Sequence, residues 1–266
     1  MIRVESVSKI YGGIKAVDGV SVEIAEGSIT GLIGPNGAGK TTLFNVMAGT
    51  TPPTSGRIFL DGEDITGLPS HDLFHKGLLR TFQIAHEFTN LSVTENLMMV
   101  PPGQSGETLW TTWTRPGRVW AEEKATRARA EDVIDFLKLN HVADELAGNL
   151  SGGQKKLLEL GRTMMVDAKL VLLDEVGAGV NRTLLAEVGD AIRRLNQERK
   201  YTFCMIEHDL DFISRLCDPV IVMAEGKVLT IGTADEVKAN EEVIEAYLGR
   251  GRKVAANHSA TKEPAS

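Results

Sequence analysis

Apolar positions follow two different spacings along this chain. Near the N-terminus they alternate with polar residues, as in Val20, Val22 and Ile24, and this period of two predicts half-buried strands. Farther on, short continuous apolar runs are typical of strands that are buried on both faces. Runs of this kind lie at 28–34, 170–173 and 201–206.

Segments with helical spacing separate these strands. Residues 40–48 predict a helix that Gly49 ends, and Ser92 with Glu95 forms a capping-box pattern that opens a second helix. Residues 219–231 predict a hairpin around a Glu-Gly turn. Strands that alternate with helices indicate an α/β fold with a mostly parallel sheet. Further helices are predicted at 121–139, 151–166 and around 184–195.

The middle of the chain interrupts this alternation. Residues 87–150 are mainly helical in pattern and predict a subdomain inserted between two core segments, 1–86 and 151–249. Within it, 101–120 is rich in proline, glycine and threonine and predicts an irregular connector. The polar tail, 250–266, predicts disorder. The connector holds all three tryptophans, which we expect to pack on the helical subdomain: Trp110, Trp113 and Trp120.

The composition of the 266 residues is that of a soluble globular protein, with 42% hydrophobic and 24% charged residues. A net charge of −7 argues against a chain that mainly coats nucleic acid, and we expect no nucleic-acid partner. No run approaches the ~18 apolar residues of a membrane span, and the N-terminal segment lacks the apolar core of a signal peptide. The two cysteines, Cys204 and Cys217, lack a metal-ligand spacing and fit a reducing cytosol.

A glycine-rich loop is the first candidate site. Residues 34–41 read GPNGAGKT, fit G-x-x-x-x-G-K-[ST], and lie between a predicted strand and a predicted helix. Glycines let backbone amides face phosphates, and the helix N-terminus adds positive potential. Lys40 can then reach the β- and γ-phosphates of ATP, and Thr41 can ligate Mg²⁺. The residues predicted to hold ATP here are Asn36, Gly37, Ala38, Gly39, Lys40, Thr41 and Thr42.

Two carboxylates, Asp174 and Glu175, follow the apolar run at 170–173. Ligands of open α/β sheets lie beyond the carboxyl ends of the strands, where these side chains are expected. Asp174 is suited to hold Mg²⁺, directly or through water. Glu175 is suited to polarise an attacking water as general base.

The segment that indicates the family is 150–154, LSGGQ. Ser151 can cap a helix, and Gly152 and Gly153 leave backbone amides unobstructed, which makes a second anion site together with Gln154. This segment resembles the signature of the ABC ATPase family. We expect Lys155 and Lys156, which follow it, to form a solvated helix face.

The resemblance covers about residues 3–248 and implies both fold and assembly. It implies a RecA-like P-loop core with a mostly parallel sheet, an N-terminal antiparallel β subdomain and an inserted α-helical subdomain. In this family two subunits sandwich two nucleotides, and the signature of one contacts the γ-phosphate held by the other. The resemblance therefore implies a homodimer or a heterodimer with a second ATPase subunit.

Three further positions match residues with roles in the family. Tyr11 matches the aromatic residue that stacks on adenine. Gln83 matches the glutamine that senses Mg²⁺ and the membrane partner. His208 matches the switch histidine, which bonds the γ-phosphate and orients water. The resemblance thus implies a catalytic set of Lys40, Gln83, Glu175 and His208, and a metal set of Thr41, Gln83 and Asp174.

One position departs from the family pattern. Val176 stands where the family usually has proline, and the loop at 178–181 follows. Valine, unlike proline, does not fix the backbone angle φ. Gly177 and Gly179 give the backbone further conformational freedom, so we expect a looser loop here. This departure bears on hydrolysis rate and on coupling between the two sites, and leaves the prediction of nucleotide binding unchanged.

Within the family, the chain looks most like the ATPase subunits of branched-chain, or hydrophobic, amino acid importers. RTFQ at 80–83, LSVTENLM at 91–98 and VIEAYLG at 243–249 carry this resemblance. It implies two transmembrane permease subunits as partners and, indirectly, a periplasmic substrate-binding protein. It also implies a peripheral location at the cytoplasmic face of the inner membrane. ATPases of urea, amide or aromatic-acid importers and of lipopolysaccharide exporters are similar and stay open as alternatives.

Two other classes compete with a transport ATPase. ABC ATPases of DNA repair or translation usually carry tandem cassettes or a long coiled-coil insertion, and neither is found in this sequence. Because the loop after Glu175 is altered, a non-catalytic regulatory module stays an alternative function. A GTPase is disfavoured because no guanine-reading N-K-x-D motif follows the phosphate loop.

Overall fold

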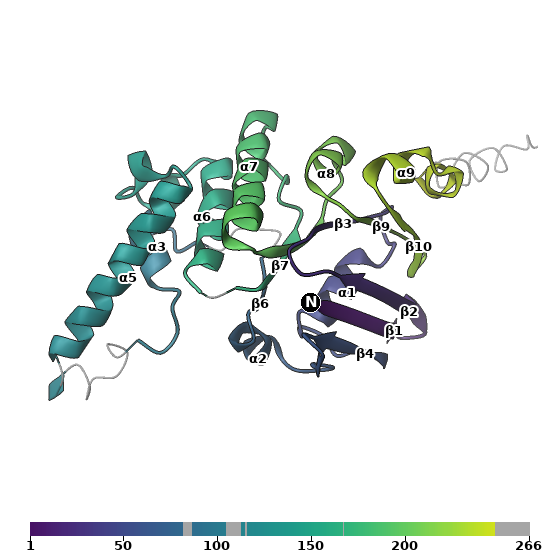
Figure 1. The fold of residues 1–266 in the computed structure, drawn as a ribbon, viewed down its shortest axis with the longest axis horizontal. Coiled ribbons are helices and arrows are strands. Elements are labelled where there is room, and N and C mark those ends of the chain that lie inside the picture. The colour runs from purple at the N-terminus through teal and green to yellow at the C-terminus, as the bar shows by residue number, and fades with distance from the viewer. Residues whose placement is uncertain (82–86, 105–112, 115, 167, 248–266) are drawn as a thin grey trace, which may run out of the picture. The chain divides into compact units, whose positions relative to one another are not determined.

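The structure is a computed structural model that describes residues 1–81, 87–104, 113–114, 116–166 and 168–247 (Figure 1). The described residues belong to two compact units. The first unit comprises Met1–His75 and the chain from Thr202 onwards, and the second comprises Lys76–Tyr201. Gln83 lies outside the described residues, as do 250–266.

An antiparallel sheet opens the first unit. Its strands are β1 (Ile2–Tyr11), β2 (Ile14–Ile24), β4 (Ser55–Leu60) and β5 (Glu63–Asp64), in the order β2-β1-β4-β5. Val20, Val22 and Ile24 are buried while the residues between them are exposed. The period-two pattern therefore predicted both the strand and its buried face correctly.

The other sheet strands of the first unit are β3 (Ile29–Ile33), β8 (Thr202–Ile206), β9 (Val220–Ala224) and β10 (Lys227–Gly232). β3 pairs in parallel with both β8 and β9, and β10 pairs antiparallel with β9. Every residue of β3 and β8 is buried, which explains their continuous apolar sequences. Glu225 and Gly226, both at positive φ, turn the predicted hairpin.

Helices α1 (Lys40–Met47), α2 (Ser70–His75), α8 (Leu210–Leu216) and α9 (Ala234–Ala239) complete the first unit, and residues 241–247 are also helical. Gly49 ends α1 with a φ of +67°. A Cβ there would lie 2.2 Å from the carbonyl oxygen of Leu68, so the chain turns where only glycine fits. The predicted stop is thereby confirmed.

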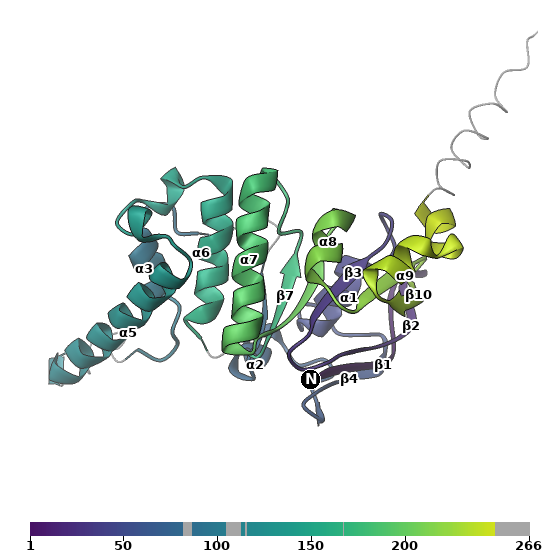
Figure 2. The same cartoon turned by 45° about the horizontal axis from the view of Figure 1, so that its top comes forward.

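The second unit has two parallel strands, β6 (Leu78–Arg80) and β7 (Leu170–Asp174). Its helices are α3 (Val93–Met98), α5 (Pro116–Phe136), α6 (Gly152–Met164) and α7 (Arg182–Arg199), with short 3-10 turns at Asn140–Val142 and Ala147–Asn149. The Ser92–Glu95 capping box that begins α3 is present as predicted. Figures 1 and 2 both show α6 and α7 side by side, and their residues are in contact.

The predicted connector at 101–120 is wrong in its last part, because α5 already begins at Pro116. Proline is tolerated in the first turn of a helix, where its missing N–H has no intrahelical partner. Packing of the tryptophans is also wrong for Trp113 and Trp120, whose exposed fractions are 83% and 67%. Trp120 instead lies against Lys124, whose Nζ is 5.5 Å from the ring centroid. Trp110 lies outside the described residues.

The predicted insertion at 87–150 falls wholly inside the second unit, which also contains α6, β7 and α7. Its helix α5 overlaps the helix predicted at 121–139 and buries Val133, Ile134 and Phe136. The insertion's boundaries at 87 and 150 stay a prediction.

Candidate functional site

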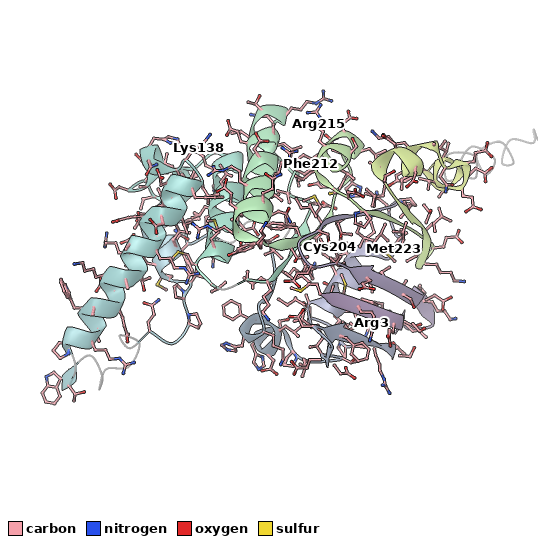
Figure 3. The ribbon with its side chains drawn as sticks, viewed as in Figure 1. Arg3, Lys138, Cys204, Phe212, Arg215 and Met223 are labelled. Carbon is pink, nitrogen blue, oxygen red and sulfur yellow. The ribbon has the colours of Figure 1, made fainter. Side chains whose placement is uncertain are left out.

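The loop between β3 and α1 has a backbone that only glycine permits. Gly34, Gly37 and Gly39 have φ values of +149°, +77° and +98°. A Cβ on Gly34 would lie 2.1 Å from the carbonyl oxygen of Met223, a residue labelled in Figure 3, and one on Gly39 would lie 2.3 Å from that of Ala16. Side chains are therefore excluded at these two positions on steric grounds, and the loop can curl tightly enough for backbone amides to face an anion.

Lys40, the first residue of α1, reaches back over this loop. Its side chain is buried, and its Nζ donates hydrogen bonds to the carbonyl oxygens of Gly34 at 2.8 Å and Pro35 at 3.2 Å. The ammonium is thus held at the mouth of the loop by acceptors that phosphate oxygens can replace. Of the neighbouring candidates, Thr41 is exposed and Thr42 is half-buried.

The first unit also carries Tyr11 and His208. Tyr11 ends β1 with an exposed fraction of 46%, and Nζ of Lys9 lies 5.1 Å from its ring centroid. His208 follows β8 and is exposed, and its backbone amide donates to the carboxylate of Glu207 at 3.2 Å. Both side chains are accessible to a ligand.

The acidic pair lies at the carboxyl end of β7 in the second unit. Asp174 is 4% exposed, and its Oδ2 accepts a hydrogen bond of 2.7 Å from Nη2 of Arg80. Glu175 is half-buried and has a φ of +50°, which is uncommon for a residue other than glycine. Such backbone strain tends to persist at functional sites, where it aims a side chain.

The LSGGQ segment begins helix α6 with a complete capping box. The backbone amide of Ser151 donates to Oε1 of Gln154 at 2.9 Å, and the amide of Gln154 donates to Oγ of Ser151 at 3.4 Å. These two bonds satisfy donors that a helix start leaves open. Ser151 therefore caps the helix as predicted.

Gly153 has a packing role that sequence reasoning missed. A Cβ on Gly153 would lie 2.6 Å from Cβ of Leu184 on α7, whereas one on Gly152 would meet only the carbonyl oxygen of Gly179, at 3.3 Å. The second glycine of the segment thus permits the close approach of α6 to α7. No local sequence signal identifies Leu184 as the partner.

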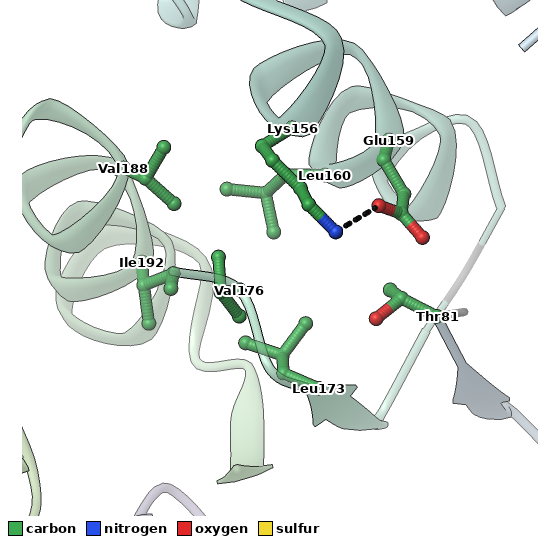
Figure 4. Close-up of a pocket in the computed structure, with 8 residues that line it drawn as sticks. All are labelled: Thr81, Lys156, Glu159, Leu160, Leu173, Val176, Val188 and Ile192. Atoms are coloured by element: carbon green, nitrogen blue, oxygen red, sulfur yellow. Dashed lines mark hydrogen bonds and ion pairs between the residues drawn. The ribbon is translucent and has the colours of Figure 1, made fainter. Parts of the chain in front are cut away.

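Val176, the departure from the family pattern, is a core residue. It is 6% exposed and lines a cavity of about 10 Å³, just large enough for one water molecule, with apolar neighbours from β7, α6 and α7 (Figure 4). These neighbours are Leu160, Leu173, Val188 and Ile192.

The expected solvated face after the signature is wrong for Lys156. This side chain is buried and lines the same cavity, where its Nζ lies 3.5 Å from Oε2 of Glu159 (Figure 4). Lys155 is only about a quarter exposed, and its Nζ lies 2.7 Å from the carboxylate of Glu87. Both lysines thus have carboxylate partners, and α6 contacts α3 and α5 as well as α7.

Arg80 is the residue of this site that sequence reasoning missed. β6 is a strand of only three residues, and no pattern along the chain marks Arg80 as the partner of a carboxylate 94 positions away. Gln83 lies outside the described residues.

Comparison with known proteins identifies the family. The sequence profile of the ABC transporter family matches residues 17–178, more than half of the chain. The chain belongs to the ABC transporter family. It is therefore an ATP-binding cassette, an enzyme that binds nucleotide and hydrolyses ATP to power transport. A second profile, described as branched-chain amino acid ATP-binding cassette transporter, matches residues 227–253.

Relatives match the cassette over almost its whole length. A probable branched-chain amino acid transport ATP-binding protein of Archaeoglobus fulgidus is 39% identical, over 94% of this chain and 95% of the relative. A high-affinity branched-chain amino acid transport ATP-binding protein of Pseudomonas aeruginosa is 34% identical, over 94% and 98%. Both matches support membership of the family.

Solved structures confirm the predicted fold class. A nucleotide-free ATP-binding cassette of an ABC transporter superposes with a TM-score of 0.80 at 34% identity, over 92% of this chain and 98% of that one. The ADP form of such a cassette also gives a TM-score of 0.80 at 34% identity, over 94% and 98%. Within the part of this cassette that the structure describes, no helix combines the length and apolarity of a membrane span.

Proposed function

We propose that this cassette is the ATP-hydrolysing subunit of an importer for branched-chain or other hydrophobic amino acids. The names of its relatives in Archaeoglobus and Pseudomonas state branched-chain amino acid transport, and the profile at 227–253 carries the same description. The cargo itself is not expected to touch this subunit. Two permease subunits at the inner membrane, and through them a periplasmic binding protein, complete the proposed assembly.

ATP binds, in this proposal, through its phosphates to residues 36–42 and through adenine to Tyr11. The glycine backbone and the buried ammonium of Lys40 support the phosphate site. The exposed ring of Tyr11 supports stacking, because a stacking face has to be accessible.

Mg²⁺ is proposed to be held by Thr41, Asp174 and Gln83. Hydroxyl, carboxylate and amide oxygens are the hard donors that this ion prefers, so the donor set fits. When bound, the ion neutralises charge on the β- and γ-phosphates. Asp174 also lies at the carboxyl end of β7, where ligands of open α/β sheets bind.

Hydrolysis is proposed to use Glu175 as general base. Its carboxylate takes the proton of the attacking water, whose oxygen forms a bond to the γ-phosphorus as the bond to the bridging oxygen breaks. His208 orients this water and bonds the γ-phosphate, and Lys40 stabilises the negative charge. The observation that carries the proposal is the pair at the end of β7, with one carboxylate buried and the next half-exposed on a strained backbone.

The signature is proposed to act in trans. Ser151, Gly152, Gly153 and Gln154 would contact the γ-phosphate of a nucleotide held by another ATPase subunit, identical or different. The capped helix start supports this role, because it orients backbone amides and a hydroxyl toward an anion.

Glu175→Gln tests the catalytic assignment. The variant should keep ATP binding, lose turnover by about 100-fold or more, and accumulate as an ATP-bound dimer, because it lacks the base that deprotonates water. Phosphate release, fluorescent-nucleotide binding and gel filtration measure the three effects.

Glu225→Gln is the matched control. Glu225 is also a glutamate at positive φ, +48°, but it lies in the β9–β10 hairpin. Its amide variant should hydrolyse ATP like the wild type. Near-normal hydrolysis by Glu175→Gln would remove Glu175 from the mechanism, and a wild-type complex without phosphate release would favour a regulatory, non-catalytic module.

A further inference from the structure

A buried ion pair joins the ends of β6 and β7. Nη2 of Arg80 lies 2.7 Å from Oδ2 of Asp174, and the exposed fractions of the two side chains are 15% and 5%. In the parallel register Arg80 is the partner of Leu172, and the amide of Thr81 donates to the carbonyl oxygen of Leu172 at 2.9 Å. Strand pairing therefore fixes the backbone from which the guanidinium reaches the carboxylate.

A carboxylate as buried as that of Asp174 is stable only with a compensating charge. Arg80 supplies this charge with a short, charge-assisted hydrogen bond. The same carboxylate is the proposed ligand of Mg²⁺. It therefore has two candidate cations, and these repel each other strongly where water is largely excluded.

We propose that Arg80 is an internal counter-ion of Asp174 that weakens the binding of divalent cations until nucleotide is present. This inference rests on the proposed role of Asp174. The phosphates of ATP add negative charge beside the metal and offset the repulsion from the guanidinium, whereas a bare ion gains no such compensation. Arg80 is a positioning residue in this account, because it acts through Asp174.

The pair also has a mechanical consequence. Arg80 and Thr81 are the last described residues before position 83, and the ion pair restrains the end of β6. If Asp174 held the metal in place of Arg80, this restraint on the strand end would weaken.

Mn²⁺, whose free form is measured by electron paramagnetic resonance, is the probe for a test on the nucleotide-free full-length chain. Arg80→Gln should bind Mn²⁺ about ten-fold more tightly than the wild type, because Asp174 has lost its competing cation. Binding of ATP in the presence of EDTA should stay within about two-fold of the wild type, which also shows that the variant is folded.

Two controls locate the effect. Arg118→Gln removes the same charge from an exposed pair, in which Nε lies 2.8 Å from the carboxylate of Glu122, and should leave Mn²⁺ binding unchanged. Asp174→Asn in the Arg80→Gln background should abolish the gain. Persistence of the gain would place the new metal site elsewhere and overturn the inference.

Equal or weaker Mn²⁺ binding by folded Arg80→Gln also overturns the inference. If that variant does not fold, Arg80→Lys decides instead, because the lysine ammonium is more strongly hydrated and cannot present a planar fork. Tighter Mn²⁺ binding than the wild type then supports the counter-ion, and unchanged or weaker binding excludes it. Asp174→Asn alone distinguishes failure of the counter-ion role of Arg80 from failure of the proposed metal role of Asp174. If this variant bound Mn·ATP with wild-type affinity, the metal role of Asp174 would be refuted.

Discussion

At the scale of single residues, burial decides the chemistry of the two thiols. Cys204 lies in the fully buried strand β8, and Cys217 follows α8 and is also buried. Loss of hydration and, to a smaller extent, the neighbouring carboxylate of Glu207 together raise the pKa of Cys217 to about 12. Burial also raises the pKa of Cys204. Both side chains act as small apolar fillers.

These pKa shifts predict thiols that stay unreactive at ordinary alkaline pH. A free thiol reacts faster as pH rises through about 8.5, because the thiolate is the nucleophile. In the folded cassette the reaction with a disulfide reagent should stay slow and nearly flat across this range, and both thiols should react once urea unfolds the chain. Rapid labelling of the native protein near pH 8.5 would contradict the burial of both thiols.

Lysine and tryptophan show where residue type misleads. Lys156 is buried beside Glu159, whereas Trp113 and Trp120 are largely exposed. A lysine has a long apolar stem that can be buried if its ammonium finds a partner, and a tryptophan at a helix start can face water at a tolerable cost. Residue type alone therefore does not decide whether such a side chain is buried or exposed.

At the scale of elements, the approach of α6 to α7 depends on one glycine. Gly153→Ala places a methyl group 2.6 Å from Cβ of Leu184, an atom close to the backbone that cannot move aside cheaply. Overpacking of this kind costs about 1–3 kcal/mol and exceeds the helix propensity of about 1 kcal/mol that alanine gains over glycine. Urea unfolding should therefore show a net loss of stability.

The adjacent glycine is the matched control for this prediction. The methyl group of Gly152→Ala meets a single atom, the carbonyl oxygen of Gly179 at 3.3 Å. The gain in helix propensity should therefore roughly cancel the energetic cost of this contact. Unfolding free energies should rank the wild type and Gly152→Ala together, above Gly153→Ala. Equal stability of the two alanine variants would contradict the close helix packing.

Most elements could be predicted because their signals are local. The capping boxes at Ser92 and Ser151 involve residues three positions apart, and uninterrupted apolar runs predict the buried strands. The start of α5 at Pro116 was missed, because proline and glycine usually mark loops and the helix begins with both.

At the scale of the whole molecule, the proposed sharing of sites between chains can be tested by complementation. Lys40→Ala should abolish both sites of a homodimer, and Ser151→Ala should weaken both. In a mixed dimer, the phosphate loop of the Ser151→Ala chain meets the intact signature of the Lys40→Ala chain. Random mixing should then restore about a quarter of wild-type turnover, since half of the dimers carry one intact site of two.

Phosphate release from the mixture, compared with each variant alone, measures this recovery. A mixture of wild type with Lys40→Ala calibrates the random exchange of subunits. Activity of the mixture no higher than the mean of the two variants would contradict a shared site within a homodimer and favour pairing with a different ATPase subunit.

The sequence by itself determined the family, the α/β class, the glycine loop at 34–39 and the order of the candidate residues. These follow from local sterics, periodicity and motifs, which act over a few neighbouring positions. Only the tertiary structure decided that Arg80 pairs with Asp174, 94 positions away, that Gly153 makes room for Leu184, and that Lys156 points inward. Such contacts depend on which strand ends and helix faces meet, and no spacing along the chain encodes that meeting.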